Sequence, residues 1–186
     1  MSHYIDLQLR PDPETAPHQL LAALYAKLHQ ALVQINSSTI GVSFPGYCAN
    51  PAGLGTVLRL CGPAPALQQL MDLPWLRGIQ DHVAVSALKA VPEKVTYQRL
   101  SRVQAKSSPE RLRRRQIKRH GLTEEQARVR VPDSCAETLA LPFVVMRSAS
   151  TGQTFRLFLR CKTSSVPSEG VFNTYGLSAT ATVPFF

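Results

Sequence analysis

The sequence predicts an α+β fold, and three of its features support this class. Stretches of alternating polar and apolar residues, which are typical of half-buried strands, occur near both ends of the chain. One long segment instead repeats its leucines at three- and four-residue steps, as an amphipathic helix does. The third feature is a basic segment that carries helix signals at both ends. A chain of 186 residues has room for one large domain or two small ones.

The first half predicts the element order β-α-β-β-α-β. A strand over His3–Arg10 is followed by a helix that begins at Pro17, because proline is favoured at the first helical position. The leucines of this helix keep one apolar face as far as Ile35. The other expected elements are a strand at Thr39–Phe44, a loop at Tyr47–Gly55, a strand at Thr56–Cys61, a helix at Pro63–Met71 and a strand at His82–Val85. This order is the ferredoxin-like pattern, which hosts many RNA binders but does not by itself assign a function.

The second half predicts a more irregular α/β arrangement after Val91-Pro92, and we therefore expect domains at 1–92 and 93–186. Ser108 is suited to cap a helix that starts at Pro109 and runs over Arg111–His120, and Gly121 can end that helix in the left-handed conformation. The remaining elements are a strand at Tyr97–Gln104, a second helix behind a Thr123/Gln126 capping box, a third helix from Asp133 to Ala140, and strands at Phe143–Met146, Phe155–Cys161 and Val171–Tyr175.

A formal net charge of +9 and an isoelectric point near 9.8 indicate a polyanionic partner. No stretch approaches the roughly 20 apolar residues of a spanning helix, and the first residues lack the pattern of a signal peptide. The four cysteines show no Cys-x-x-Cys or zinc spacing, and Cys61 and Cys161 end apolar runs that favour the core. We therefore expect a cytoplasmic protein with no membrane contact, no metal and no cofactor.

The charge is concentrated in the basic segment, which holds +6 within fourteen residues. Its cations are Lys106, Arg111, Arg113, Arg114, Arg115, Lys118 and Arg119, offset only by Glu110. Arg111, Arg115 and Arg119 are four residues apart, so they form one stripe on a helix that suits a groove lined with phosphates. The deep groove of regular A-form RNA is too narrow for a helix, so an RNA partner would need a distorted or terminated stem, such as a short hairpin. DNA fits the same helix, and the charge pattern leaves both polymers open.

Several sequence blocks resemble the type I-F CRISPR repeat endoribonucleases. The N-terminal blocks are His3-Tyr4-Ile5-Asp6, Leu9-Arg10-Pro11-Asp12-Pro13-Glu14, Lys27-Leu28-His29-Gln30-Ala31-Leu32 and Ile40-Gly41-Val42-Ser43-Phe44-Pro45. The later blocks are Ser101-Arg102-Val103-Gln104-Ala105-Lys106-Ser107, Pro109-Glu110-Arg111-Leu112-Arg113-Arg114-Arg115, Arg147-Ser148, Ser150-Thr151-Gly152-Gln153, Phe155-Arg156-Leu157-Phe158 and Tyr175-Gly176-Leu177-Ser178. They follow the family's order over nearly the whole chain.

The resemblance implies a metal-independent enzyme that binds the hairpin of a CRISPR repeat transcript and cuts at its 3′ base, leaving a cyclic phosphate. It also implies a protein that is monomeric on its own and then stays on the mature guide RNA with the other subunits of a type I-F surveillance complex. His29 falls where the family has its general base, and the residue type suits that role because its ordinary pKa lies near neutrality. Ser148 matches a serine that holds the 2′-hydroxyl, and Tyr175 matches a tyrosine that orients the histidine.

The resemblance also implies the RNA contacts. Arg102 and Gln104 match residues that read base edges at the foot of the stem, and Phe155 matches an aromatic that stacks on the terminal base pair. The groove contacts implied are Arg111, Arg114, Arg115, Lys118, Arg119 and His120. Lys118 stands where the family has arginine; lysine lacks the bidentate fork, which favours a phosphate contact.

Two other functions fit the same residues. A hairpin-binding module without catalysis would need the same fold and basic helix, with His29 in a purely structural role. A DNA-binding regulator would use the three helices between Pro109 and Ala140 as a helix-turn-helix reader.

Overall fold

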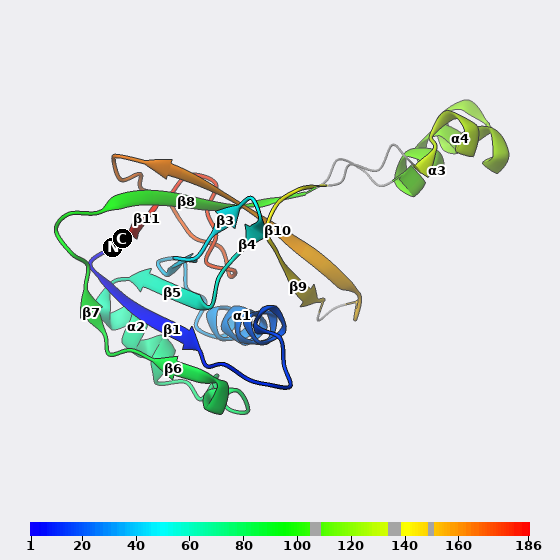
Figure 1. Ribbon diagram of the computed structural model, residues 1–186. Coiled ribbons are helices and arrows are strands. Elements are labelled where there is room, and N and C mark those ends of the chain that lie inside the picture. The colour runs from blue at the N-terminus through cyan, green and yellow to red at the C-terminus, as the bar shows by residue number, and fades with distance from the viewer. Residues whose placement is uncertain (105–108, 134–138, 149–150) are drawn as a thin grey trace. The chain divides into compact units, whose positions relative to one another are not determined.

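The computed structural model describes residues 1–104, 109–133, 139–148 and 151–186 and has a mixed α+β architecture (Figure 1). The chain forms two compact units, one made of Met1–Val103 with Leu141–Phe186 and the other of Gln104–Ala140. Lys106, Ser108, Cys135 and the body of the predicted third helix lie outside the described residues. Among the described residues, no helix has the length and apolar character needed to cross a membrane.

The first sheet of the larger unit has the order β2-β5-β1-β6, and all of its pairs are antiparallel. Its strands are β1 (His3–Leu9), β2 (Gly41–Ser43), β5 (Val57–Gly62) and β6 (Val83–Val85), with β7 (Lys89–Ala90) also paired to β1. A short 3-10 helix, η1 (Gln80–His82), precedes β6. Ile5, Leu7 and Leu9 are buried as their alternation predicts.

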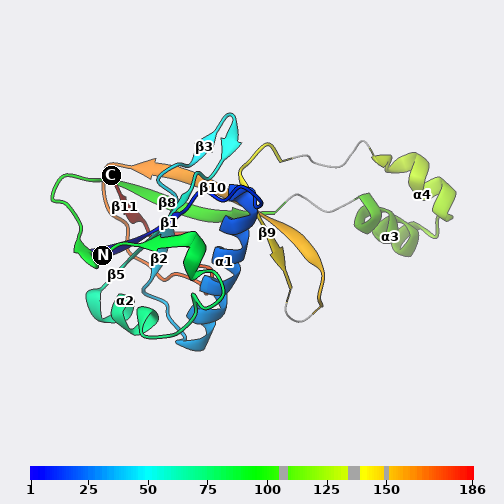
Figure 2. The same cartoon turned by 60° about the horizontal axis from the view of Figure 1, so that its bottom comes forward.

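Helix α1 (Pro17–Gln34) joins this sheet to the rest of the core. It begins at Pro17, as expected, and buries the leucines of its apolar face. It ends before Asn36, which adopts a left-handed backbone with φ of 47°. The core that includes this face also contains side chains of the second sheet, such as Leu157 and Leu159, and α1 lies beside β9 (Figure 2). Helix α2 (Ala64–Met71) packs on β1 and β5.

The second sheet has the order β11-β8-β10-β9, again antiparallel. Its strands are β8 (Thr96–Val103), β9 (Phe143–Arg147), β10 (Thr154–Ser164) and β11 (Val183–Phe185). Val144, Met146, Leu157 and Leu159 point into the core, and their strand neighbours point away from it. This alternation places two different surfaces on the two sides of the sheet.

Two expectations about the connecting segments were wrong. The predicted loop at Tyr47–Gly55 contains a small hairpin of β3 (Cys48–Ala49) and β4 (Ala52–Gly53). The predicted strand at Val171–Tyr175 is instead an irregular segment that leads into a turn. Its reason is local: the Asn173 side chain accepts hydrogen bonds from the chain that follows it, which bends the backbone out of the extended form.

The smaller unit is a pair of helices, α3 (Pro109–His120) and α4 (Glu124–Arg130). Gly121 ends α3 with φ of 62°, and the predicted Thr123/Gln126 capping box is present, with bonds of 3.1 and 3.3 Å. Arg113 connects α3 to the end of α4, because its guanidinium donates to the Val131 carbonyl at 2.8 Å and to the Asp133 carboxylate at 2.6 Å.

Candidate active site

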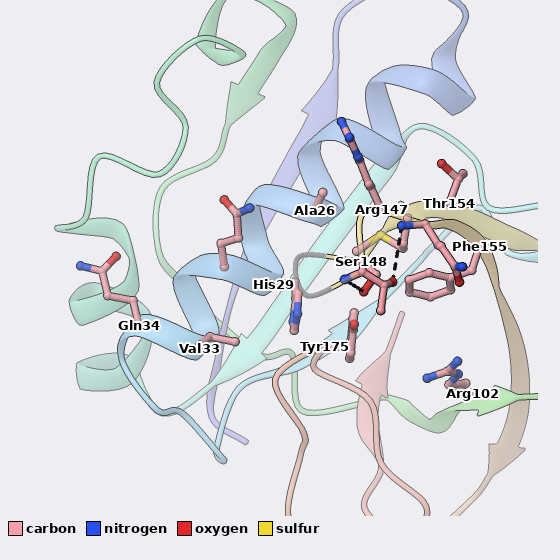
Figure 3. Close-up of a pocket in the computed structure, with 14 residues that line it drawn as sticks. Ala26, His29, Val33, Gln34, Arg102, Arg147, Ser148, Thr154, Phe155 and Tyr175 are labelled. Carbon is pink, nitrogen blue, oxygen red and sulfur yellow. Dashed lines mark hydrogen bonds between the residues drawn. The ribbon is translucent and has the colours of Figure 1, made fainter.

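An open pocket of about 790 Å³ in the larger unit is lined by all three predicted catalytic residues (Figure 3). Its walls come from α1, the end of β8, the β9–β10 hairpin and the segment before β11. The lining residues are Ala26, His29, Gln30, Val33, Gln34, Arg102, Met146, Arg147, Ser148, Thr151, Gln153, Thr154, Phe155 and Tyr175. These described residues include two arginines and no acidic side chain, so the pocket favours an anion.

His29 is held in one orientation by two contacts. The residue lies half-buried on α1, directly after the buried Leu28. Its Nδ1 is 2.8 Å from the Thr174 carbonyl oxygen, and its ring stacks on Tyr175 with centroids 3.8 Å apart and planes 4° from parallel. A carbonyl only accepts hydrogen bonds, so Nδ1 carries the hydrogen. In the neutral ring Nε2 is then the acceptor, which is the form that a general base requires.

The turn that supplies these contacts is itself fixed on both sides. The Asn173 side-chain oxygen accepts the N–H groups of Tyr175 and Leu177 at 2.9 and 3.1 Å. The hydroxyl of Tyr25, which is fully buried one helical turn before His29, donates to the Tyr175 carbonyl at 2.7 Å. Burial raises the pKa of Tyr25 far above its ordinary value, so this hydroxyl keeps its proton and remains a donor.

Gly176 allows this turn to close against the first sheet. It has φ of 68°, and a Cβ at this position would lie 2.5 Å from Cγ1 of Val42. The Gly176 carbonyl accepts the Val42 N–H at 3.0 Å. The glycine therefore meets two requirements at once, a left-handed backbone and a close approach to β2.

Ser148 lies in the connection between β9 and β10, and Figure 3 shows it near His29 of α1. Its hydroxyl oxygen accepts the Thr151 N–H at 3.2 Å, and its backbone pairs with Gln153 and Gly152 at 2.9 Å each. These bonds place the serine at the end of the hairpin, where it faces the same pocket as His29 and Tyr175. Residues 149 and 150 lie outside the described part of this connection.

Arg102 and Phe155 form a second wall of the pocket. Arg102 is exposed at the end of β8, and its guanidinium carbon is 5.6 Å from the centroid of the Phe155 ring. Strand pairing of β8 with β10 brings the two residues to the same end of the sheet. A cation beside an aromatic ring offers both charge and a stacking surface to a nucleotide.

The other predicted RNA contacts belong to the smaller unit. Gln104 is exposed at its beginning, and α3 carries the remaining six, which are Arg111, Arg114, Arg115, Lys118, Arg119 and His120, all exposed. Arg114 makes a loose pair with Glu110 at 3.8 Å.

Some residues of the pocket were not predicted from the sequence. Arg147 belongs to a sequence block that resembles the family, but no role was predicted for it. It lines the pocket beside Ser148, and its Nε donates to the Gly152 carbonyl at 3.2 Å. Thr174 contributes through its backbone carbonyl, which no side-chain pattern reveals. Ala26 and Val33 also line the pocket and could have been found from their helical spacing, because they lie three residues before and four residues after His29.

Among the described residues, no group of three or more histidine, cysteine, aspartate or glutamate side chains is arranged to hold a metal ion.

An oriented histidine, a serine and two guanidinium groups around one open pocket define an α+β protein with a site suited to an anionic ligand. The family model of CRISPR-associated protein (Cas_Csy4) matches residues 4–186, and the chain therefore belongs to this family. The resemblance to type I-F repeat-processing nucleases is confirmed at this level.

Two relatives extend over the full length of the chain. A protein of Pseudomonas aeruginosa (strain UCBPP-PA14), named CRISPR-associated endonuclease Cas6/Csy4, is 51% identical over 187 residues and covers 100% of both chains. A protein of the same name from Escherichia coli (strain UTI89 / UPEC) is 44% identical, also over 100% of both chains. A solved structure described as an RAMP protein binding different RNA substrates aligns over 98% of this chain and 99% of its own, at 10% identity and with a TM-score of 0.36.

Proposed function

We propose that the chain is an endoribonuclease that processes CRISPR repeat RNA. Family membership and the two relatives named endonucleases support the reaction class. The observation that carries the proposal is the His29 ring, whose Nδ1–H bond to the Thr174 carbonyl leaves Nε2 as the acceptor of a proton within the pocket.

In this mechanism His29 Nε2 takes the proton of the 2′-hydroxyl next to the scissile phosphate. The 2′-oxygen attacks the phosphorus, the bond from phosphorus to the 5′-oxygen breaks, and the leaving oxygen takes up a proton. The products are a 2′,3′-cyclic phosphate and a 5′-hydroxyl, and no step uses a metal. General base catalysis of this kind contributes roughly 10² to 10⁴ in rate.

Ser148 and Tyr175 have supporting roles in this mechanism. Ser148 holds the 2′-hydroxyl in line with the phosphate, and its bond from the Thr151 N–H at 3.2 Å fixes where the serine oxygen lies. The Tyr175 ring stacks on the His29 imidazole with centroids 3.8 Å apart and so fixes the orientation of the imidazole plane. Arg102 and Arg147 offset the charge that develops on the phosphoryl oxygens, because both line the same pocket.

We propose that the substrate is the repeat hairpin, cut at its 3′ base. Arg102 and Gln104 read bases at the foot of the stem, and Phe155 stacks on the terminal pair. The exposed cations of α3 and His120 bind the groove of the stem. The strand order β2-β5-β1-β6 supports a ferredoxin-like N-terminal part, which forms the scaffold for His29. The protein acts as a cytoplasmic monomer and then remains on the guide RNA among the other subunits of a surveillance complex.

The test is cleavage of a labelled repeat hairpin in excess chelator. The wild type should cut at the 3′ base and leave a cyclic phosphate, and His29→Ala should lose at least 10²-fold in rate while it still binds the hairpin. His18→Ala is the matched control, because His18 is exposed in the first turn of the same helix and does not line the site. Tight binding without cleavage by any of the proteins would identify a hairpin-binding module, and a preference for duplex DNA would identify a regulator.

A further inference from the structure

The side of the second sheet that faces away from the core carries cations and aromatic rings together. Strand alternation assigns these residues, because directly paired residues of antiparallel strands share a face. Phe143, paired with Phe158, and Val145, paired with Arg156, are on this side, whereas Val144 and Met146 are in the core. We call this side the outer sheet face; its cations are Arg99, Arg147, Arg156, Arg160 and Lys162, and its aromatic residues are Tyr97, Phe143 and Phe158.

The charges of the outer sheet face are not compensated. Within the described part of the chain, no carboxylate lies within ion-pair distance of any of its five cations. Arg99 is paired directly opposite Lys162, although like charges in opposite positions destabilise a sheet. Arg160 is two residues before Lys162 on the same side of β10, about 6.8 Å away along the strand. A fold that keeps these repelling groups together is suited to a polyanion that neutralises them.

The aromatic residues indicate what kind of polyanion fits. Phe143 is 40% exposed, and its ring lies 5.4 Å from that of Phe158. The Arg156 guanidinium lies 4.8 Å from the Phe143 centroid. Exposed rings between cations are the arrangement that binds unpaired bases by stacking while the cations track the phosphates. A stem would present paired bases, whose faces are not available to these rings.

The outer sheet face is continuous with the pocket that contains His29. Arg147 lines that pocket, and its register opposite Thr154 places it at the hairpin end of the same face. From there the cations continue along β10 through Arg156 and Arg160 to Lys162. A strand of RNA that leaves the pocket past Arg147 would therefore meet this row.

We propose that the outer sheet face binds the single-stranded RNA that flanks the hairpin. The proposal rests on the proposed function for the identity of the RNA, but not on cleavage. It adds a second RNA surface, made of the β8–β10–β9 strands, to the basic helix. The outer sheet face should add affinity for the flank without a preference for its sequence, because every nucleotide has a phosphate and a base face that can stack on a ring.

The test compares a repeat hairpin alone with the same hairpin carrying a single-stranded flank on its 5′ or its 3′ side. A 2′-deoxy nucleotide at the cut site prevents cleavage during the binding measurement. The double variant Arg160→Glu/Lys162→Glu should lose the gain in affinity that the flank provides and bind the bare hairpin within about threefold of the wild type. Two lost phosphate contacts should also make the slope of log K against log salt shallower by about 1.4 for the flanked RNA.

The matched control is Lys89→Glu/Lys94→Glu, which changes the net charge equally at two exposed lysines that do not belong to the outer sheet face. Arg160→Gln/Lys162→Gln is a milder second variant, and thermal unfolding of both checks that they fold. If the variant loses as much affinity for the bare hairpin as for the flanked one, the outer sheet face binds the stem. If it loses affinity for neither RNA, the face binds a protein partner. Either result overturns the proposal. A flank effect without cleavage of all-ribose RNA would reject the proposed activity but keep this inference.

Discussion

His29 depends on groups that are distant in sequence for the orientation of its ring. Its helix supplies the position, but the hydrogen-bond acceptor and the stacking partner come from Thr174 and Tyr175. That turn is in turn anchored to the helix by the buried Tyr25 hydroxyl, one turn before the histidine. These contacts connect α1 to the turn and the turn back to α1. A substitution of Tyr25 should therefore disturb the orientation of the His29 ring through the turn, without a direct contact between the two side chains.

We therefore predict that Tyr25→Phe lowers the rate of cleavage more than it lowers RNA binding. Loss of the 2.7 Å bond leaves the Tyr175 carbonyl without its donor and should cost about 1 kcal/mol of unfolding free energy. An equal loss of stabilisation in the transition state corresponds to roughly a fivefold fall in kcat. The measurement is single-turnover cleavage beside RNA affinity, well below the unfolding temperature.

The control for this substitution is Tyr47→Phe. Tyr47 also donates to a backbone carbonyl, that of Leu159 at 3.4 Å, but this carbonyl lies in β10 and not in the turn that holds His29. If both variants slow cleavage equally, or if Tyr25→Phe weakens only binding, Tyr25 does not position the histidine.

The cysteines provide a residue-scale test of the fold. Cys61 is fully buried beside Phe172 and Val183, and burial raises its pKa to about 12. Only about 10⁻⁴ of it would be thiolate at pH 8, and the thiolate is the reactive form. Brief alkylation of the native protein at pH 8 should therefore modify the exposed Cys48 and spare Cys61, as read by peptide mass spectrometry. Rapid modification of Cys61 before unfolding would contradict the packing of β5.

At the scale of elements, arginines of one helix have different functions. Arg113 donates to both the Val131 carbonyl and the Asp133 carboxylate, and its side chain is 14% exposed. Arg114, its neighbour, is 80% exposed and is only loosely paired. Arg113 therefore stabilises the helix pair, and the arginines around it remain directed to solvent.

This difference predicts opposite results for two neighbouring alanine substitutions. Arg113→Ala should destabilise α3 and α4 by about 1–3 kcal/mol, because it removes two hydrogen bonds, one of them to a charged group. Arg114→Ala should change their stability by less than about 0.5 kcal/mol, since exposed ion pairs contribute little. Amide hydrogen exchange of the two helices measures both; equal protection in the two variants would contradict the role of Arg113.

The elements that could be predicted from the sequence are those with a local cause. The alternation in β1, the apolar face of α1 and the Thr123/Gln126 capping box are properties of adjacent residues, and all were confirmed. The turn around Tyr175 was missed because its apolar residues satisfy a strand pattern. Its actual shape depends on Asn173 and on the approach of Gly176 to Val42, which is a tertiary contact.

At the scale of the whole molecule, the pocket could not be derived from periodicity. Its walls come from segments that the pairing of β8 with β10 and the packing of α1 bring together. The family resemblance identified His29, Ser148 and Tyr175 as a set, and the structure places all three around one pocket. Neither periodicity nor the family resemblance assigned Arg147 to the pocket, because its place in the lining follows only from the position of the β9–β10 hairpin.

The distribution of charge over both units leads to a last prediction. The net charge of +9 includes the exposed cations of α3, which leave out Arg113, and the cations of the outer sheet face, which are all exposed except the half-buried Arg99. If about six phosphates of the hairpin are neutralised, log K should fall with log salt at a slope of about −4 to −5, or roughly 10³ in affinity between 50 and 200 mM. Arg115→Ala and Arg119→Ala should each make this slope shallower by about 0.7 to 0.9, because each removes one counterion-releasing contact. Lys94→Ala is the control with the same loss of charge outside both sets, and it should leave the slope unchanged. A flat salt response of the wild type would show that the positive charge does not meet a phosphate backbone, and binding would then have to depend on base contacts at the pocket alone.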